Sequence, residues 1–109
     1  MSDWIRKDGY ETCLQAAADT LNAIGTEVYL IRFRSGKRSH YHKKTTEFFY
    51  FTAGTGRVVL SGREQKLYPG ATVIVQPHIT HTFMNDSAEV LLEAVLVKIN
   101  SFPEDTYPT

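Results

Sequence analysis

The chain has 109 residues, 42% hydrophobic and 22% charged, and its 12 basic residues balance its 12 acidic ones. This length predicts one domain with a modest core. The balanced charge, without a strongly basic segment, argues against a nucleic-acid partner, and the longest apolar run is far too short to span a bilayer.

The N-terminus and the cysteine usage bear on the compartment. Met1–Asp8 has an acid where a signal peptide needs an apolar segment. The single cysteine, Cys13, allows no internal disulfide. We therefore expect a cytoplasmic protein in which Cys13 is a buried, inert thiol.

Residues 1–26 differ in pattern from the rest of the chain. Within Glu11–Asn22, apolar residues are spaced like one face of a short helix: Leu14, Ala17, Ala18 and Leu21. Asn22 and Gly25 can end such a helix. A strand around Trp4–Tyr10 that pairs with a neighbouring sheet is a further element to consider. We predict that residues 1–26 cap one end of a barrel and do not form a separate domain.

From Glu27 onward the pattern is that of β-strands separated by turns with glycine or proline. The predicted strands are Glu27–Arg34, Ser39–His42, Glu47–Ala53, Arg57–Leu60, Glu64–Leu67, Ala71–Gln76, Thr80–Asn85 and Glu89–Ile99. Seven or eight short strands of this kind indicate an all-β sandwich or barrel. The tail, residues 100–109, carries two prolines and two acids, and we expect it to be extended and loosely held.

A cluster of metal-ligating residue types lies near the middle of the chain. His40 and His42 are two apart, so in a strand their side chains point to the same face. A short polar turn follows, and Glu47 then opens the next strand and can point back at the same place. Two imidazoles and one carboxylate arranged in this way predict a transition-metal site with open coordination positions. His81, well downstream, is a fourth ligand candidate.

The strand that Glu47 opens alternates in a way that assigns its two faces. Phe49 and Phe51 share the face of Glu47, so we expect them, with Phe83, to wall a pocket for a small, partly apolar ligand.

On the opposite face, Phe48 and Tyr50 would form an exposed aromatic patch in a monomer. We therefore predict a homodimer packed through that face, to which Trp4 or Ile5 contributes.

Other polar residues have weaker claims to a role. His78 lies in a loop near the predicted site and is a weak candidate for a catalytic proton shuttle, although an exposed loop histidine is the simpler reading. Arg32 and Glu93 are expected on the solvent face of their strands. Tyr41 lies between two histidines and so points away from the metal, which predicts a packing role.

These residues resemble the two motifs of the cupin superfamily. The first reads Gly36, three residues, His40-Tyr41-His42, four residues, Glu47, six residues and Gly54; the second reads Gly70, six residues, Pro77, three residues, His81, three residues and Asn85. The spacers after Gly36 and Gly70 differ from the family pattern by a residue or two, and the turn after Pro77 lacks the usual glycine, but both departures lie in turns.

The resemblance implies a fold and a metal. Over residues 27–99 it implies a double-stranded β-helix of six to eight strands, the jelly-roll type, so the expected fold class is all-β with a short N-terminal helical segment. It also implies one divalent metal ion bound by His40, His42, Glu47 and His81. Fe, Mn, Ni, Co, Cu and Zn all remain open.

Four protein ligands on an octahedral ion leave two positions for water, dioxygen or substrate. This favours a metalloenzyme of the dioxygenase or isomerase type acting on a small organic molecule. The alternative is a non-catalytic cupin that binds a small ligand or a metal as a sensor or storage module. A purely structural metal is a third possibility.

Overall fold

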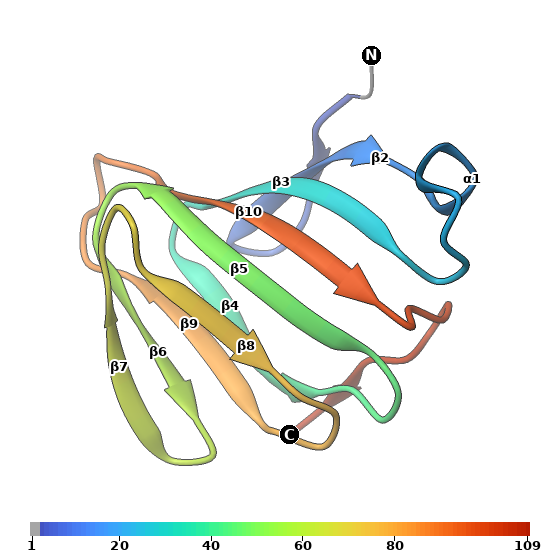
Figure 1. The fold of residues 1–109 in the computed structure, drawn as a ribbon. Coiled ribbons are helices and arrows are strands. Elements are labelled where there is room, and N and C mark those ends of the chain that lie inside the picture. The colour runs from blue at the N-terminus through green and yellow to red at the C-terminus, as the bar shows by residue number, and fades with distance from the viewer. Residues whose placement is uncertain (1–2) are drawn as a thin grey trace.

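The computed structural model describes residues 3–109 and shows a chain made almost entirely of strands in two antiparallel sheets (Figure 1). The strands are β1 (Ile5–Arg6), β2 (Tyr10–Ala16), β3 (Glu27–Phe33), β4 (Gly36–Tyr41), β5 (Thr46–Ala53), β6 (Gly56–Leu60), β7 (Arg63–Leu67), β8 (Thr72–Val75), β9 (His81–Asn85), β10 (Leu92–Ile99) and β11 (Tyr107–Pro108), and the helix is α1 (Ala18–Leu21). The all-β jelly-roll fold with a short helix near the N-terminus is therefore confirmed.

The two sheets face each other and enclose the core. One sheet has the order β1-β2-β3-β10-β5-β8, and the other has the order β11-β4-β9-β6-β7. Strands of period two bury one face, so β5 places Phe49 and Phe51 inside while Phe48 and Tyr50 point outward. Val73, Leu96 and Phe83 join these buried phenylalanines from three other strands.

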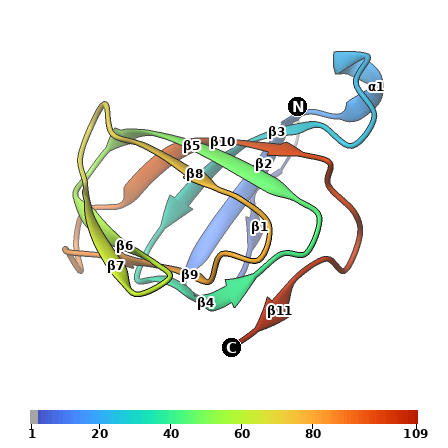
Figure 2. The ribbon, with the colours of Figure 1, turned by 60° about the horizontal axis from the view of Figure 1, so that its bottom comes forward.

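The predicted helix over Glu11–Asn22 is wrong for most of its length. Tyr10–Ala16 is strand β2, which pairs with β3 and places Cys13 opposite Leu30. Alanine-rich composition is only a weak preference, and pairing along a whole strand outweighs it. Only Ala18–Leu21 is helical, and it lies beyond the end of β2 (Figures 1 and 2).

The first two strands belong to the larger sheet. β1 pairs with β2, and together they continue the larger sheet beyond β3. Residues 1 and 2 of the predicted cap segment lie outside the described residues. No helix within residues 3–109 is long and apolar enough to cross a membrane.

The C-terminal tail is extended as expected, but the prediction that it is loosely held is wrong. Its strand β11 pairs with β4, placing Tyr107 opposite Tyr41 and Pro108 opposite His40. Figure 2 shows the tail running along the edge of the smaller sheet. Asp105 is buried, with a relative exposure of 8%. The tail is thus a fixed part of the wall beside His40.

Two glycines of the first motif are required by close backbone approaches. Gly36 has a φ of +152°, and a Cβ there would overlap the carbonyl oxygen of Phe83 in the neighbouring strand. Gly54 has a φ of +81°, and a Cβ there would overlap the carbonyl oxygen of Leu91. These positions let β4 and β5 approach β9 and β10 at the ends where the chain turns.

Candidate metal centre

The four predicted ligands come from three segments that meet between the two sheets. His40 is on β4, directly opposite His81 at the start of β9, and their ring centroids are 4.1 Å apart. His42 follows the last residue of β4, and a three-residue turn then carries the chain across to the other sheet. Glu47 is the second residue of β5 in that sheet. The site therefore joins both layers of the fold.

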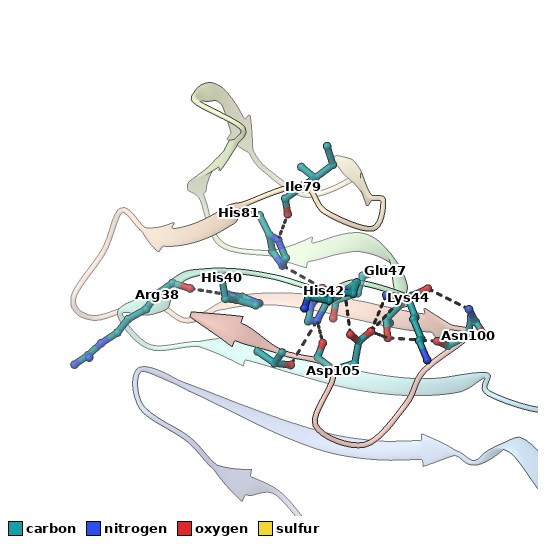
Figure 3. Close-up of polar contacts among 12 residues, drawn as sticks. Arg38, His40, His42, Lys44, Glu47, Ile79, His81, Asn100 and Asp105 are labelled. Atoms are coloured by element: carbon teal, nitrogen blue, oxygen red, sulfur yellow. Dashed lines mark hydrogen bonds and ion pairs between the residues drawn. The ribbon is translucent and has the colours of Figure 1, made fainter. Parts of the chain in front are cut away.

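All four side chains are buried and their polar ends converge (Figure 3). One ligand atom from each of His40, His42, Glu47 and His81 can be chosen so that all lie within 4.8 Å of one another. Glu47 Oε1 lies 3.2 Å from His42 Nε2 and 3.3 Å from His81 Nε2. None of the four residues exceeds 4% relative exposure.

Backbone carbonyls set the tautomer of every histidine in the cluster. His40 Nδ1 lies 2.7 Å from the Arg38 carbonyl oxygen, and His81 Nδ1 lies 2.9 Å from that of Ile79. His42 Nδ1 lies 2.6 Å from the carbonyl oxygen of Asp105 (Figure 3). A carbonyl only accepts hydrogen bonds, so each Nδ1 must donate its proton. In the neutral imidazole each Nε2 then carries a lone pair directed at the centre of the cluster.

The donor set at this centre fits a divalent transition metal ion. His40 Nε2, His81 Nε2 and Glu47 Oε2 are buried without a hydrogen-bond partner among the described residues. Buried polar atoms without a partner are rare in folded proteins, and three of them together indicate that a cation binds between them. Imidazole nitrogen and carboxylate oxygen are ligands that Mn, Fe, Co, Ni, Cu and Zn accept. Glu47 Oε1 and the neutral His42 Nε2 both accept hydrogen bonds, so their 3.2 Å contact is repulsive unless a metal ion or a proton lies between them.

The electrostatics of the site differ from one ligand to the next. Burial lowers the pKa of His40 to about 3, with the charge of Lys37 adding to the effect, so this imidazole stays neutral. Burial also lowers the pKa of His42, but the hydrogen bond and charge of Glu47 outweigh it and raise that pKa above 6.5. Burial would raise the pKa of Glu47, yet contact with His42 and His81 holds it well below its ordinary value.

Asp105 ties the C-terminal tail to the turn between the ligands. Its carboxylate accepts hydrogen bonds from the backbone N–H groups of Lys43, Lys44 and Thr45 at 2.9, 3.0 and 2.9 Å, and from the Thr45 hydroxyl at 2.9 Å. The same residue's carbonyl holds His42. Asp105 therefore positions both the turn and one ligand, a role that the sequence does not reveal because these partners are about 60 positions away.

The three phenylalanines predicted to wall a pocket are part of the closed core. Phe49, Phe51 and Phe83 have relative exposures of 2%, 0% and 1%. Phe83 meets the ring of His81 edge-on at 6.1 Å. Phe83 thus places apolar material beside His81, and the role of the three phenylalanines as a ligand pocket stays a prediction.

Other candidates lie apart from the cluster. His78 is exposed, has a φ of +69° and stacks on Tyr41, and its backbone N–H donates to the His42 carbonyl oxygen. Its imidazole is not among the grouped ligands. Arg32 pairs with Glu11 at 3.2 Å on the outer side of the sheet, and its cross-strand neighbour Glu93 lies in the same row.

A small cavity opens beside the metal centre and was not predicted. Its volume is about 280 Å³, and it is lined by residues of β4 including Lys37 and His40, by Tyr10 of β2, and by Thr106 and Pro108 of the tail. The sequence places Lys37 in a turn signal, Ser35-Gly36-Lys37, and no residue pattern marks it as a cavity residue.

The fold and centre together define a small jelly-roll protein with a buried three-histidine, one-glutamate group that fits a metal ion. The sequence model of the family described as "Cupin domain" matches residues 30–98. This match spans more than half of the chain, and the protein belongs to the cupin family. No curated protein sequence shows significant similarity to this chain.

Solved structures with the same fold are numerous and distant in sequence. A Streptomyces PAC13 variant with uridine has a TM-score of 0.77 at 16% identity, with 99% of this chain and 88% of that chain covered. Ectoine synthase from P. lautus has a TM-score of 0.76 at 19% identity, covering 98% and 80%. A B. subtilis oxalate decarboxylase variant has a TM-score of 0.79 at 19% identity, covering 99% of this chain and 30% of that one. At these identities the likeness shows a shared fold.

Proposed function

We propose that this protein is a small metalloenzyme that holds one divalent transition metal ion with His40, His42, Glu47 and His81 and acts on a small organic molecule. The observation that carries the proposal is the convergence of four buried ligand candidates. Three of their polar atoms, His40 Nε2, His81 Nε2 and Glu47 Oε2, have no hydrogen-bond partner among residues 3–109. PAC13 is described as a nucleoside dehydratase, and ectoine synthase and oxalate decarboxylase are also named for reactions of small molecules.

Each residue has a definite part in this function. The Arg38, Asp105 and Ile79 carbonyls fix the three imidazoles so that no tautomer change is needed on metal binding. Glu47 supplies the negative charge that reduces the net charge of a divalent centre. A metal ion held by these four residues would supply Lewis acidity and open coordination positions. The cavity beside His40 gives a small molecule its approach to the centre.

The reaction class is proposed as dioxygenase or isomerase. Both use a metal with neighbouring open positions, and both suit a water-poor site backed by Phe83. The alternative function, a sensor or storage module, would use the same four metal ligands as the enzyme. It differs from the enzyme only because it converts no substrate.

Metal content is the first test. Protein purified without added ions is analysed for metals, and we expect about one equivalent of a divalent transition metal per chain and a rise in Tm on loading. Glu47→Gln should lower metal affinity by at least about tenfold. The matched control, His78→Gln, changes an exposed histidine outside the cluster and should retain the metal.

Turnover then separates the functions. Oxygen uptake and product formation are followed with catechols, thiols and dicarbonyls under Fe, Mn and Cu loading. Absence of metal in the wild type, or equal metal content in Glu47→Gln, would refute the metal centre. Metal and tight ligand binding without turnover would favour the sensor or storage module. If Glu47→Gln lowers only the Tm and leaves ligand binding intact, the metal is structural.

A further inference from the structure

We propose that Lys37 and Tyr10 form a binding subsite for the carboxylate group of a small organic acid, next to the metal centre. This inference deepens the proposed function, because it names the chemical class of the molecule that the metal centre acts on. It rests on the strand geometry around Lys37, on the environment of its ammonium group and on the cavity that Lys37 shares with His40.

A β-bulge directs Lys37 into the same cavity as a metal ligand. In a regular strand, residues three apart point to opposite faces. Lys37 pairs with Phe83 and His40 pairs with His81, so two residues of β4 lie opposite the single Thr82. The Thr82 hydroxyl donates to the Lys37 carbonyl oxygen at 2.7 Å and holds this arrangement. Lys37 and His40 both line the cavity of about 280 Å³ as a result.

The ammonium group of Lys37 is partly buried and forms no ion pair with another described residue. Within residues 3–109, no ion pair involves Lys37, and its Nζ lies 4.7 Å from the ring centroid of Tyr10. Burial lowers the pKa of Lys37, and the charge of Glu47 offsets only part of this effect. An anion bound in the cavity would restore the interactions that this cation loses on leaving water.

The neighbouring charges match a ligand with a single negative charge. Arg38, the adjacent cation, pairs with Asp8 at 3.1 Å, and both side chains are highly exposed at the rim. Lys7 also lines the cavity but is exposed. One partly buried ammonium group suits a carboxylate better than a phosphate, which has more charge and more oxygens to satisfy.

Tyr10 gives the cavity both a hydrogen-bond donor, its hydroxyl, and an apolar surface, its ring. Burial raises the pKa of Tyr10, so its hydroxyl stays protonated at neutral pH and can donate to a carboxylate oxygen. Its ring packs on Phe33, with centroids 6.2 Å apart, which fixes its position. The cavity is small by the standard of drug-sized sites, which span roughly 300–1,000 Å³, so the ligand has only a few heavy atoms.

The subsite and the candidate metal centre share one cavity. Lys37 and His40 lie three positions apart on β4, and both line it. A small acid with its carboxylate on Lys37 would direct its neighbouring oxygen toward the metal. Ser39, between the two, also lines this cavity.

Binding of simple acids to the zinc-loaded protein tests the subsite without any turnover. Calorimetric titrations use pyruvate, oxalate and acetate, with methyl pyruvate as a neutral analogue and inorganic phosphate as the competing anion. We expect carboxylate binding that Lys37→Met weakens by about tenfold or more, and that Lys37→Arg retains in part because the charge remains. The matched control is Lys66→Met on the exposed side of β7, which should leave binding unchanged.

The outcomes separate this inference from the proposed function. Metal content is measured on every variant, since loss of metal from the wild type would refute the metalloenzyme itself. If the wild type and Lys37→Met both hold one metal and bind pyruvate equally, the carboxylate subsite is refuted and the metal centre stands. The subsite is also refuted if none of the three acids binds, or if phosphate or methyl pyruvate binds as well as pyruvate does.

Discussion

At the scale of single residues, the centre is built from histidines that differ in their readiness to accept a proton. The pKa of His40 is lowered to about 3, first by burial and then by the charge of Lys37. In the neutral pH range, therefore, no proton competes with a metal for His40. His42 has its pKa raised, because Glu47 outweighs burial. A metal ion bound by His42 would therefore have to displace a proton.

This difference predicts the pH dependence of metal affinity. The raised pKa of His42 means that its protonated form is stabilised in the metal-free protein, and this stabilisation is lost as pH rises through that pKa. Metal affinity should fall as pH drops through the same range, with an onset above pH 6.5. Competition titrations with Co²⁺ between pH 5.5 and 8.5 measure this. An affinity that stays constant down to pH 6 would contradict the assignment.

The grouping of the four candidate ligands was predictable because their signal is local and is carried by two motifs. His40, His42 and Glu47 follow from the period of two in strands and one short turn. Lys37 was not predictable, because its direction depends on a bulge opposite Thr82 that no local residue pattern announces.

At the scale of elements, the turn between β4 and β5 depends on a segment from the far end of the chain. The Asp105 carboxylate accepts four hydrogen bonds from residues 43–45. Burial raises the pKa of Asp105, but these bonds lower it from 3.8 to about 2. The resulting stabilisation is present above pH 3.8 and is lost as pH falls through about 2.

Replacing this one carboxylate should loosen the turn and the centre together. Asp105→Asn leaves one or more buried N–H groups facing an amide, which we expect to cost about 1–3 kcal/mol of stability, or a fall in Tm of roughly 4–8 °C per kcal/mol. The substitution keeps the Asp105 backbone carbonyl that holds His42, but it loosens the segment that carries this carbonyl, so metal affinity should fall by about tenfold. The control is Glu104→Gln at the exposed neighbouring position.

Thermal unfolding at pH 7 and pH 2 and metal titration measure both effects. The stability difference between wild type and Asp105→Asn should shrink at pH 2, where the wild-type carboxylate becomes protonated. Equal effects of Asp105→Asn and Glu104→Gln, or an unchanged metal affinity in Asp105→Asn, would contradict the positioning role.

The strands were predictable from alternation and turn residues, whereas β2 and the tail were not. β2 covers the first part of Glu11–Asn22, and the helix-like spacing of that segment is overridden by the pairing of β2 with β3. β11 is only two residues long, and contacts with Tyr41 and His40 hold it in place. Both elements are decided by partners distant in sequence, which local patterns cannot convey.

At the scale of the whole molecule, the larger sheet has an outward face that is apolar along two rows. One row joins Leu30, Val95 and Tyr50, and the next joins Val28, Val97, Phe48 and Ile74. Tyr50 and Ile74 have relative exposures of 45% and 59%. In Figure 1 this face points toward the viewer, and within residues 3–109 no helix lies over it. A continuous apolar face of this kind marks an interaction surface.

We expect that a second copy of the chain covers this face, giving a homodimer. In a two-fold dimer the same surface of each copy meets its counterpart, so this one face could cover itself in a second copy. Tyr50→Lys places a charge at the centre of the face and should convert the dimer to a monomer. Tyr50 points away from Phe49 and Phe51, so the core and metal content should be unchanged.

Light scattering coupled to size-exclusion chromatography measures the mass of each variant across a range of concentrations. The matched control is Tyr68→Lys, which changes an equally large exposed tyrosine in the turn between β7 and β8. A dimer that persists in Tyr68→Lys and is lost in Tyr50→Lys supports the face. A wild type that runs as a monomer at high concentration refutes it, because its apolar rows would then stay in water.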